Sequence, residues 1–235
     1  MMLPLLKGEN VMSGTTSDYV KMAAEVDRLD EEGRRDEAVS LAREVAEQAR
    51  NADDEGFALF FSGESLCLEG NLEGGETLIR QAAAALPGET LVLVNHAIVL
   101  SLLGKTRRAV QILNRSLELK PDDLVALGQK GVCLAKLGYG RESLEAFDRI
   151  LALDPDNLHA LRNRGVALSR LGREKEAMAC FDKALAADPA DPHAQSEKKI
   201  LEEEMRLKGT PLGWMVIWAR KKVAPAFKRA ANPLG

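Results

Sequence analysis

The sequence predicts an all-α protein built from a repeated pair of helices, and three observations support this. Four prolines follow one another at intervals of 34 residues, a period typical of repeat proteins: Pro87, Pro121, Pro155 and Pro189. A glycine stands at the same distance before each of them, where left-handed backbone suits the end of a helix: Gly70, Gly104, Gly138 and Gly172. Aromatic residues make up only 4% of the chain, whereas strands favour aromatic and β-branched side chains. This composition argues against an all-β fold.

The composition predicts a folded chain in a reducing compartment. Of the 235 residues, 46% are hydrophobic and 29% charged, as in soluble globular proteins. The three cysteines, Cys67, Cys133 and Cys180, are odd in number and far apart in the sequence, so they encode neither a disulfide framework nor a zinc pair. We expect a cytoplasmic protein.

The N-terminal region is expected to hold a flexible segment, residues 1–17, followed by a degenerate first repeat, residues 19–52. The segment MMLPLLKGENV lacks the features of a signal peptide, and Met12 is a candidate start of translation. In the first repeat Leu29, Gly33, Ala38 and Val45 keep the register of the later repeats. Arg50 replaces the proline, and three extra residues precede Gly56.

Four further repeats are expected at 56–89, 90–123, 124–157 and 158–191, so that the repeat region covers 18–191. In each, leucines and a small residue spaced at i, i+4 and i+7 form one face of the first helix. The second helix pairs a small residue with a large one four positions later, which allows close helix packing: Gly75 with Ile79, Ala109 with Leu113, Ser143 with Phe147, and Ala177 with Phe181. The proline then ends the helix.

Two segments follow the repeats. Residues 192–208 are expected to form a charged helix that caps the stack. Residues 209–235 form a basic amphipathic tail, and the last thirty residues, 206–235, carry seven basic and no acidic side chains. The rest of the chain has 25 basic and 36 acidic residues, a net charge of −11. The two parts therefore require separate interpretation.

The repeats resemble the tetratricopeptide repeat (TPR) family. The segments LGYGRESLEAFDRILALDP from Leu137 and LGREKEAMACFDKALAADP from Leu171 match the second half of its motif, and the resemblance covers about 170 residues. Leucines replace aromatic residues at two family positions, and Gly74-Gly75 is expected to weaken one helix. The resemblance implies a right-handed superhelical solenoid of about five hairpins with a C-terminal capping helix, whose first helices line a concave groove.

The family's groove positions, carried onto this sequence, give the candidate peptide-binding residues. At one end these are mostly apolar: Phe57, Phe60, Phe61, Leu91, Val94 and Ile98. A row of carboxamides follows, which suits hydrogen bonding to a peptide backbone: Asn95, Gln129 and Asn163. The other end is basic: His159, Arg162 and Arg170. We expect a ligand with apolar residues at the first end and an acidic group at the last. Core packing is the alternative for the phenylalanines, and a solvated helix face for the arginines.

The tail offers a second contact through Trp214, Trp218, Lys221, Lys222, Lys228 and Arg229. Docking on the repeats or on a second copy is the first interpretation. A reversible contact with an anionic membrane at the inner membrane surface is the second, because an amphipathic basic helix with tryptophans suits such a surface. Nucleic acid ranks last, since the acidic repeats would repel phosphate.

No catalytic motif or cofactor fingerprint occurs, and the three histidines are dispersed without metal-ligand spacing. We therefore expect no enzyme, no cofactor and no metal. The sequence predicts a scaffold that holds a peptide or protein segment in its groove, with a membrane-associated assembly factor as the alternative.

Overall fold

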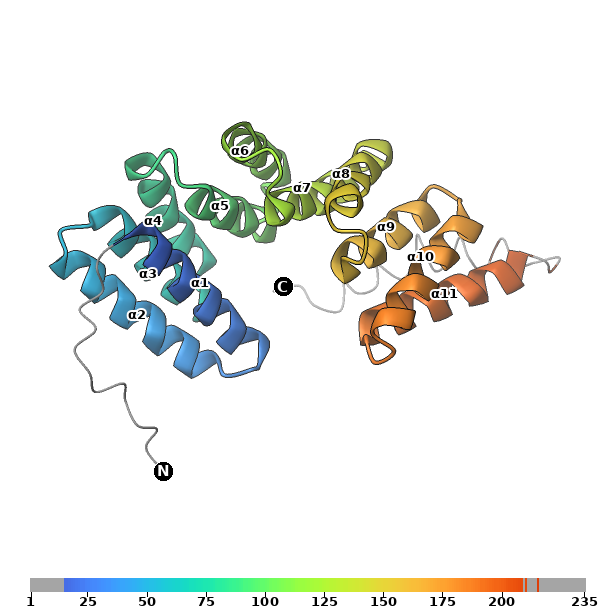
Figure 1. Cartoon of the computed structure of the whole chain (residues 1–235), viewed down its shortest axis with the longest axis horizontal. Helices are drawn as coiled ribbons and strands as arrows, with labels where there is room; N and C mark the ends of the chain where they lie inside the picture. Colours follow the sequence, from blue (N-terminus) through green and yellow to red (C-terminus); the bar gives the residue numbers. More distant parts are fainter. Residues whose placement is uncertain (1–14, 209, 211–214, 216–235) are drawn as a thin grey trace, which may run out of the picture. The chain divides into compact units, whose positions relative to one another are not determined.

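The computed structural model describes residues 15–208, 210 and 215, and these form eleven α-helices and no strand. The helices follow the chain as antiparallel hairpins (Figure 1). Their bounds are α1 Thr16–Glu31, α2 Arg35–Asn51, α3 Glu55–Leu68, α4 Leu72–Ala85, α5 Thr90–Leu102, α6 Thr106–Leu119, α7 Leu124–Leu137, α8 Gly140–Leu153, α9 Leu158–Arg170, α10 Glu174–Ala187 and α11 Pro192–Lys208. The expected all-α fold of about five hairpins and a final helix is confirmed.

Two details differ from expectation at the N-terminal end. Thr16 and Ser17 are helical, because α1 begins before the end of the segment expected to be flexible. Residues 1–14, including Met12, lie outside the described residues. Asp53 takes a positive φ of 58° in the connection between α2 and α3, where the three extra residues occur.

The turn within each hairpin is a glycine in the left-handed region. Gly33, Gly70, Gly104, Gly138 and Gly172 have φ angles between 74° and 88°. A side chain is strained at such angles, so glycine ends the first helix at little cost. The prediction from the 34-residue period is confirmed at the last four positions, and Gly33 takes the same conformation in the degenerate first repeat.

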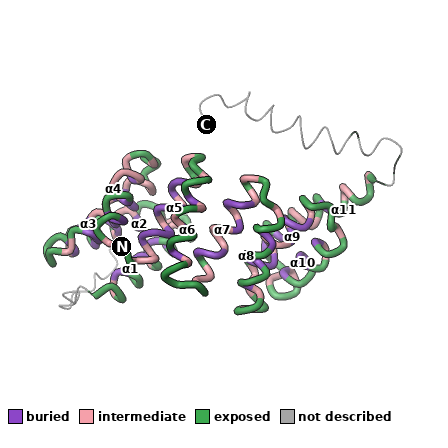
Figure 2. Tube along the Cα trace, turned by 90° about the horizontal axis from the view of Figure 1, so that it is seen from above, coloured by how far each residue is buried: buried purple, intermediate pink, exposed green. Residues whose placement is uncertain are grey.

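The chain divides into two compact units, Met1–Leu137 and Gly138–Gly235, so the boundary falls within the fourth expected repeat. In the first unit α3 packs against both α2 and α4, and α5 against α4, α6 and α7. In the second unit α9 packs against α8 and α10, and α11 against α10 and α9. Figure 2 shows buried positions along the helices and exposed connections between them.

The predicted pairing of a small with a large residue is confirmed in the core. Ile79, Leu113, Phe147 and Phe181 are each 0–1% exposed. Gly63 of α3 and Gly75 of α4 bring their helices together: a Cβ added to Gly75 would lie 2.7 Å from the carbonyl oxygen of Gly63. The glycine that weakens α4 as a helix is therefore required for packing.

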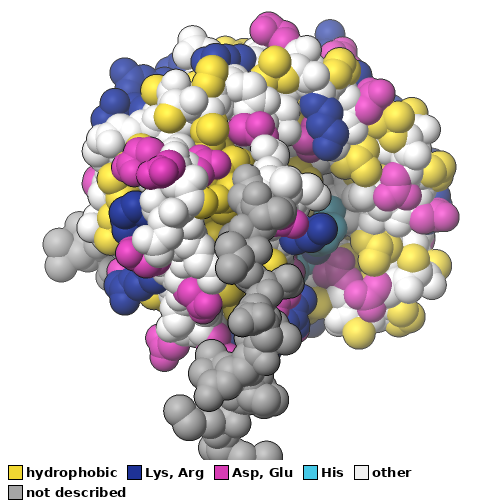
Figure 3. All heavy atoms as spheres, turned by 60° about the vertical axis from the view of Figure 1, so that its left-hand side comes forward, with side chains coloured by type: hydrophobic (Ala, Val, Ile, Leu, Met, Phe, Trp, Pro, Cys, Tyr) yellow, Lys and Arg dark blue, Asp and Glu magenta, His cyan; other side chains and the backbone are white. Residues whose placement is uncertain are grey.

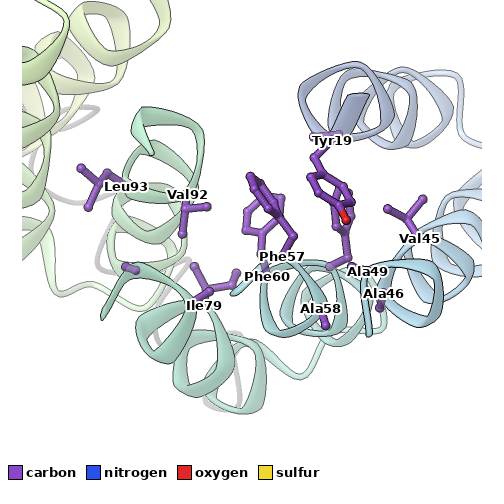
Figure 4. Packing of buried hydrophobic residues seen from close by; sticks show 14 of the residues in the cluster. Tyr19, Val45, Ala46, Ala49, Phe57, Ala58, Phe60, Ile79, Val92 and Leu93 are labelled. Carbon is purple, nitrogen blue, oxygen red and sulfur yellow. The ribbon is translucent and has the colours of Figure 1, made fainter. Parts of the chain in front are cut away.

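An aromatic cluster joins α1 to α3 in the first unit. The rings of Tyr19 and Phe57 stack with centroids 4.2 Å apart, and Phe60 meets Phe61 edge to face at 5.0 Å. Figure 4 shows Tyr19, Phe57 and Phe60 together, with Ile79 and Val92 beyond them. The degenerate first repeat is thus anchored by the most aromatic part of the core.

Candidate functional site

The first unit contains a cavity of about 290 Å³ lined mainly by α1, α3 and α5, the first helices of three consecutive repeats. Its polar lining consists of Asp27 and Asp30 from α1, Arg35 from α2, Glu64 and Cys67 from α3, and Asn95 from α5. Its apolar lining includes Ile98, Val99 and Leu102 from α5. The cavity thus combines an acidic side with an apolar side.

Glu64 is the most buried ionisable group of this cavity. Its side chain lies on the inner face of α3, and the residue is 8% exposed. Burial, followed by the nearby charge of Asp27, raises the pKa of the Glu64 carboxyl well above its usual value of 4.5. Its Oε2 atom has no hydrogen-bond partner among the described residues.

Two neighbouring groups have perturbed pKa values for the same reason. Desolvation by neighbouring protein atoms raises the pKa of the Asp27 carboxyl, and the charges of Glu31 and Asp30 add to this effect. Asp27 is nevertheless an exposed residue. Burial and the charge of Glu64 raise the pKa of the Cys67 thiol to about 11. Cys67 is therefore a protonated thiol near neutral pH, not a nucleophile.

The cavity has one basic lining residue, and it is engaged. The Arg35 Nε atom donates a hydrogen bond to the Asp30 carboxylate over 2.8 Å, and both groups are partly exposed. This pair neutralises Asp30 and leaves Asp27 and Glu64 without a basic partner on the cavity wall.

The predicted apolar end of the groove is mostly core. Phe57, Phe60 and Phe61 are 2%, 0% and 0% exposed, so core packing accounts for all three and direct ligand contact is not available to them. Val94 is 5% exposed, and Leu91 packs against the same cluster as the phenylalanines. Tyr19 of the first repeat stacks on Phe57 and lies tilted beside Phe61.

The carboxamide row is divided between the units. Asn95 lines the cavity together with Ile98, and its Nδ2 donates to the backbone oxygen of Leu91 over 3.3 Å. Gln129 lies half-buried on α7 outside the cavity lining. Asn163 lies half-buried on α9, in the second unit.

The predicted basic end belongs to the second unit and is partly engaged. Arg162 Nη1 donates to Asp191 Oδ2 over 3.2 Å, and Arg162 Nη2 lies 3.1 Å from His159 Nδ1. Burial opposes ionisation of Asp191, but backbone hydrogen bonds from Ala194 and His193, with the charge of Arg162, hold the pKa of Asp191 below its usual value. Arg170 is exposed and has no ion-pair partner among the described residues.

The acidic side of the cavity was not foreseen, although a sequence signal for it exists. Asp27, Glu64 and Ile98 each stand six residues before a turn glycine, Gly33, Gly70 and Gly104 respectively. They therefore occupy one register position in three successive repeats, and all three line the cavity. Projecting this position back into the degenerate first repeat would have found Asp27.

Metal-binding and membrane-spanning features are both missing from the part of the chain that the structure describes. There, no set of three or more His, Cys, Asp or Glu side chains is arranged to hold a metal ion. Within the same residues, every helix is too short or too polar to span a bilayer. The predicted tail contacts, Trp214, Trp218, Lys221, Lys222, Lys228 and Arg229, lie outside the described residues.

Comparisons with known proteins agree with the repeat interpretation. Two family models for the tetratricopeptide repeat match residues 92–123 and 141–202. No curated protein matches the sequence significantly.

Solved structures with the same fold include TTC0263 of Thermus thermophilus, at 18% identity, covering 78% of this chain and 98% of that one, with a TM-score of 0.65. MamA of Desulfovibrio magneticus RS-1, residues 41 to the end, matches at 18% identity over 74% of this chain and 97% of that one, TM-score 0.60. YrrB, described as a TPR protein with an unusual peptide-binding site, matches at 22% identity over 80% and 94%, TM-score 0.57. The 34-residue period, the glycine turns and both family models thus lead to one conclusion: the chain contains tetratricopeptide repeats, which the family models match at 92–123 and 141–202.

Proposed function

We propose that this protein is a non-catalytic adaptor that binds a segment of another protein on the first helices of its N-terminal repeats. The observation that carries the proposal is the cavity between α1, α3 and α5, which places Asn95 beside exposed apolar surface. Leu102, at its edge, is 60% exposed. The peptide-binding site ascribed to YrrB, a protein of the same fold, supports the same use of the repeats.

Affinity purification from native extract tests this proposal. We expect partners retained by the wild-type chain to be lost with the Asn95→Ala/Leu102→Lys double variant, which alters only the cavity wall and its edge. Leu119→Lys is the matched control, because Leu119 lies on α6 of the same unit, is 50% exposed and does not line the cavity. Equal helicity of all three proteins by circular dichroism is required. Partners that persist in the double variant would refute the location.

The predicted row of Asn95, Gln129 and Asn163 remains part of the proposal as two separate binding surfaces, one in each unit. Arg170 and Asn163 supply the polar groups of the second. The single variants Asn95→Ala and Asn163→Ala separate these two surfaces. A partner held only by the first unit is lost with Asn95→Ala and retained with Asn163→Ala.

A second candidate function, attachment to an anionic membrane, rests on the seven basic and no acidic residues of 206–235. Liposome co-sedimentation tests it. Binding to anionic but not neutral vesicles, lost on deletion of 209–235, supports attachment, whereas no binding at low salt excludes it.

A further inference from the structure

The cavity of the first unit holds an acid for which the described part of the chain supplies no hydrogen-bond partner. Glu64 is only 8% exposed, and its Oε2 has none among the described residues. A buried polar group without a partner is costly, so such groups are rare in folded proteins. An apolar residue at this position, like Ile98 at the equivalent position of the next repeat, would avoid this cost. The retained carboxyl indicates a ligand that interacts with it.

The charge around Glu64 indicates the sign of that ligand. Asp27, Asp30 and Glu64 supply three carboxyl groups to the cavity lining, against one guanidinium. That guanidinium, of Arg35, is bound to Asp30 at 2.8 Å. Asp27 acts electrostatically on Glu64, so a cation placed between them would stabilise the ionised form of both.

The apolar wall indicates the shape of the ligand. Ile98 and Leu102 lie one turn apart on α5, with Val99 beside them, and all three line the cavity. Leu102 is largely exposed at its edge. A volume of about 290 Å³ is near the lower limit for ligand pockets, about 300 Å³, and suits a side chain better than a folded element. A long aliphatic stem with a cationic end matches both walls.

We propose that this cavity binds a lysine or arginine side chain of a partner polypeptide. The ammonium or guanidinium group lies against Glu64 and Asp27, and the aliphatic stem lies along Ile98 and Leu102. The proposal rests on the adaptor function and names the chemistry of the bound segment. Where Glu64 is protonated in the free protein, binding of the cation releases that proton to solvent and leaves an ion pair.

On the face seen in Figure 3, acidic, basic and hydrophobic side chains are mixed, without one dominant charge. The cavity differs because Asp27 acts electrostatically on the buried Glu64 and its one base is bound to Asp30. A divalent cation is a less suitable ligand, since the described residues contain no set of three acidic or other metal-binding side chains suitably placed.

The direct test uses n-butylguanidinium and n-butylammonium as probes on the full chain, with the Glu64 carboxyl carbon observed by NMR. At a pH where titration of the free protein shows the Glu64 carboxyl to be protonated, we expect both cations to move the Glu64 signal to its ionised position, with a dissociation constant on the order of 1 mM for so small a ligand. The isosteric neutral probe n-butylurea is expected to leave it unmoved. A Glu64 signal that ignores the cations, or that responds equally to the urea, overturns the proposal.

Variants provide the second part of the test, read as chemical-shift changes at the Asn95 side chain. Glu64→Gln is expected to weaken cation binding about tenfold or more. Glu73→Gln, an exposed acid of α4 outside the cavity, is the matched control and is expected to bind as wild type does. If Glu64→Gln does not fold, Asp27→Asn takes its place with the same expected direction. Unchanged binding in the folded cavity variant contradicts the proposal.

Failure of this proposal and failure of the adaptor function are distinguishable. Loss of partners in Asn95→Ala/Leu102→Lys with no response of Glu64 to cations leaves the adaptor intact and removes the cation site. A responsive Glu64 with partners retained in that double variant shows a cation site that the partner does not use, which also overturns the proposal as stated.

Discussion

At the scale of single residues, the contact between Gly63 and Gly75 shows how packing overrides helix propensity. Alanine stabilises a helix interior by about 1 kcal/mol relative to glycine. At Gly75, however, an added Cβ would lie 2.2 Å from the Cys67 sulfur and 2.7 Å from a backbone oxygen that has little freedom to move. The steric cost therefore exceeds the gain in propensity.

We expect Gly75→Ala to lower the free energy of unfolding by about 1–3 kcal/mol, the usual cost of overpacking a core. Urea denaturation followed by circular dichroism measures it. Gly88→Ala is the control, because a Cβ there meets no atom within 4 Å and the change should have little effect. A Gly75→Ala protein as stable as wild type would show that α3 and α4 separate without cost.

Glu64 gives the first unit a pH dependence of defined sign. Its carboxyl titrates near pH 4.5 when unfolded and at a well higher pH when folded. Between these values the folded state holds a proton that the unfolded state has lost. The free energy of unfolding therefore falls as pH rises through this window, by at most about 1.4 kcal/mol per pH unit, and levels off above the folded pKa.

The difference in unfolding free energy between wild type and Glu64→Gln, measured across this window, isolates the contribution of Glu64 from those of the other carboxyls. We expect the wild type to lose stability relative to the variant as pH rises. The difference in unfolding free energy between wild type and the control Glu73→Gln should show no such trend with pH. A difference that is flat with pH would mean that Glu64 titrates normally.

At the same scale, sequence reasoning succeeded where one residue has one physical role. The five turn glycines were predictable because left-handed backbone has few alternatives to glycine. The burial of the phenylalanines was not, because it depends on packing between helices of different repeats, such as the stacking of Tyr19 on Phe57. The apolar end was predicted without the acidic side that Asp27 and Glu64 form.

At the scale of helices, short side chains cap several N-termini and so fix where the helices begin. Asp54, Asn71 and Asn157 accept a hydrogen bond from the backbone N–H three residues later, at 3.2, 3.0 and 3.0 Å. Asp123 does the same at 3.1 Å before α7. Asp123, two residues after the repeat proline Pro121, therefore caps the following helix.

We expect Asn157→Ala to cost about 1 kcal/mol in the free energy of unfolding, because the first turn of α9 loses its cap. Thermal and urea unfolding measure this change. Asn114→Ala is the comparison, since Asn114 is exposed in the middle of α6 and alanine is the better helix former. Equal stability of the two variants would argue against a capping role.

At the scale of the whole molecule, the division into two compact units predicts that damage stays local. The Phe181 ring lies over Gly165, where an added Cβ would come within 2.6 Å of Cε1, and Phe181 is 1% exposed. Repeat proteins propagate stability mainly between neighbouring elements. A core change in α10 should therefore affect α8–α11 first.

We expect Phe181→Ala to destabilise by about 3–5 kcal/mol and to accelerate amide hydrogen exchange in α9–α11. Exchange in α1–α4 should change far less. Mass spectrometry of peptic fragments measures both regions in one experiment. Uniform acceleration along the chain would indicate that both units unfold as one.

For the whole molecule, the sequence predicted the repeat architecture correctly but did not predict the division of the chain into two compact units. The period predicts how many hairpins form, because each repeat carries its own turn and helix-ending residues. It does not predict where packing is sparse, because that depends on the contacts summed over many side chains. The predicted groove residues consequently fell into two separate units, with Asn95 in one and Asn163 in the other.

The position of the unit boundary also determines how this chain should be cut for expression. Repeat borders suggest fragments that end near residue 123 or 157, but either choice would divide a compact unit. The boundary at Leu137 and Gly138 instead coincides with a turn where Gly138 and Tyr139 are exposed. A fragment of 15–137 keeps the Glu64 cavity with every helix that lines it, and is suited to crystallisation with a basic peptide.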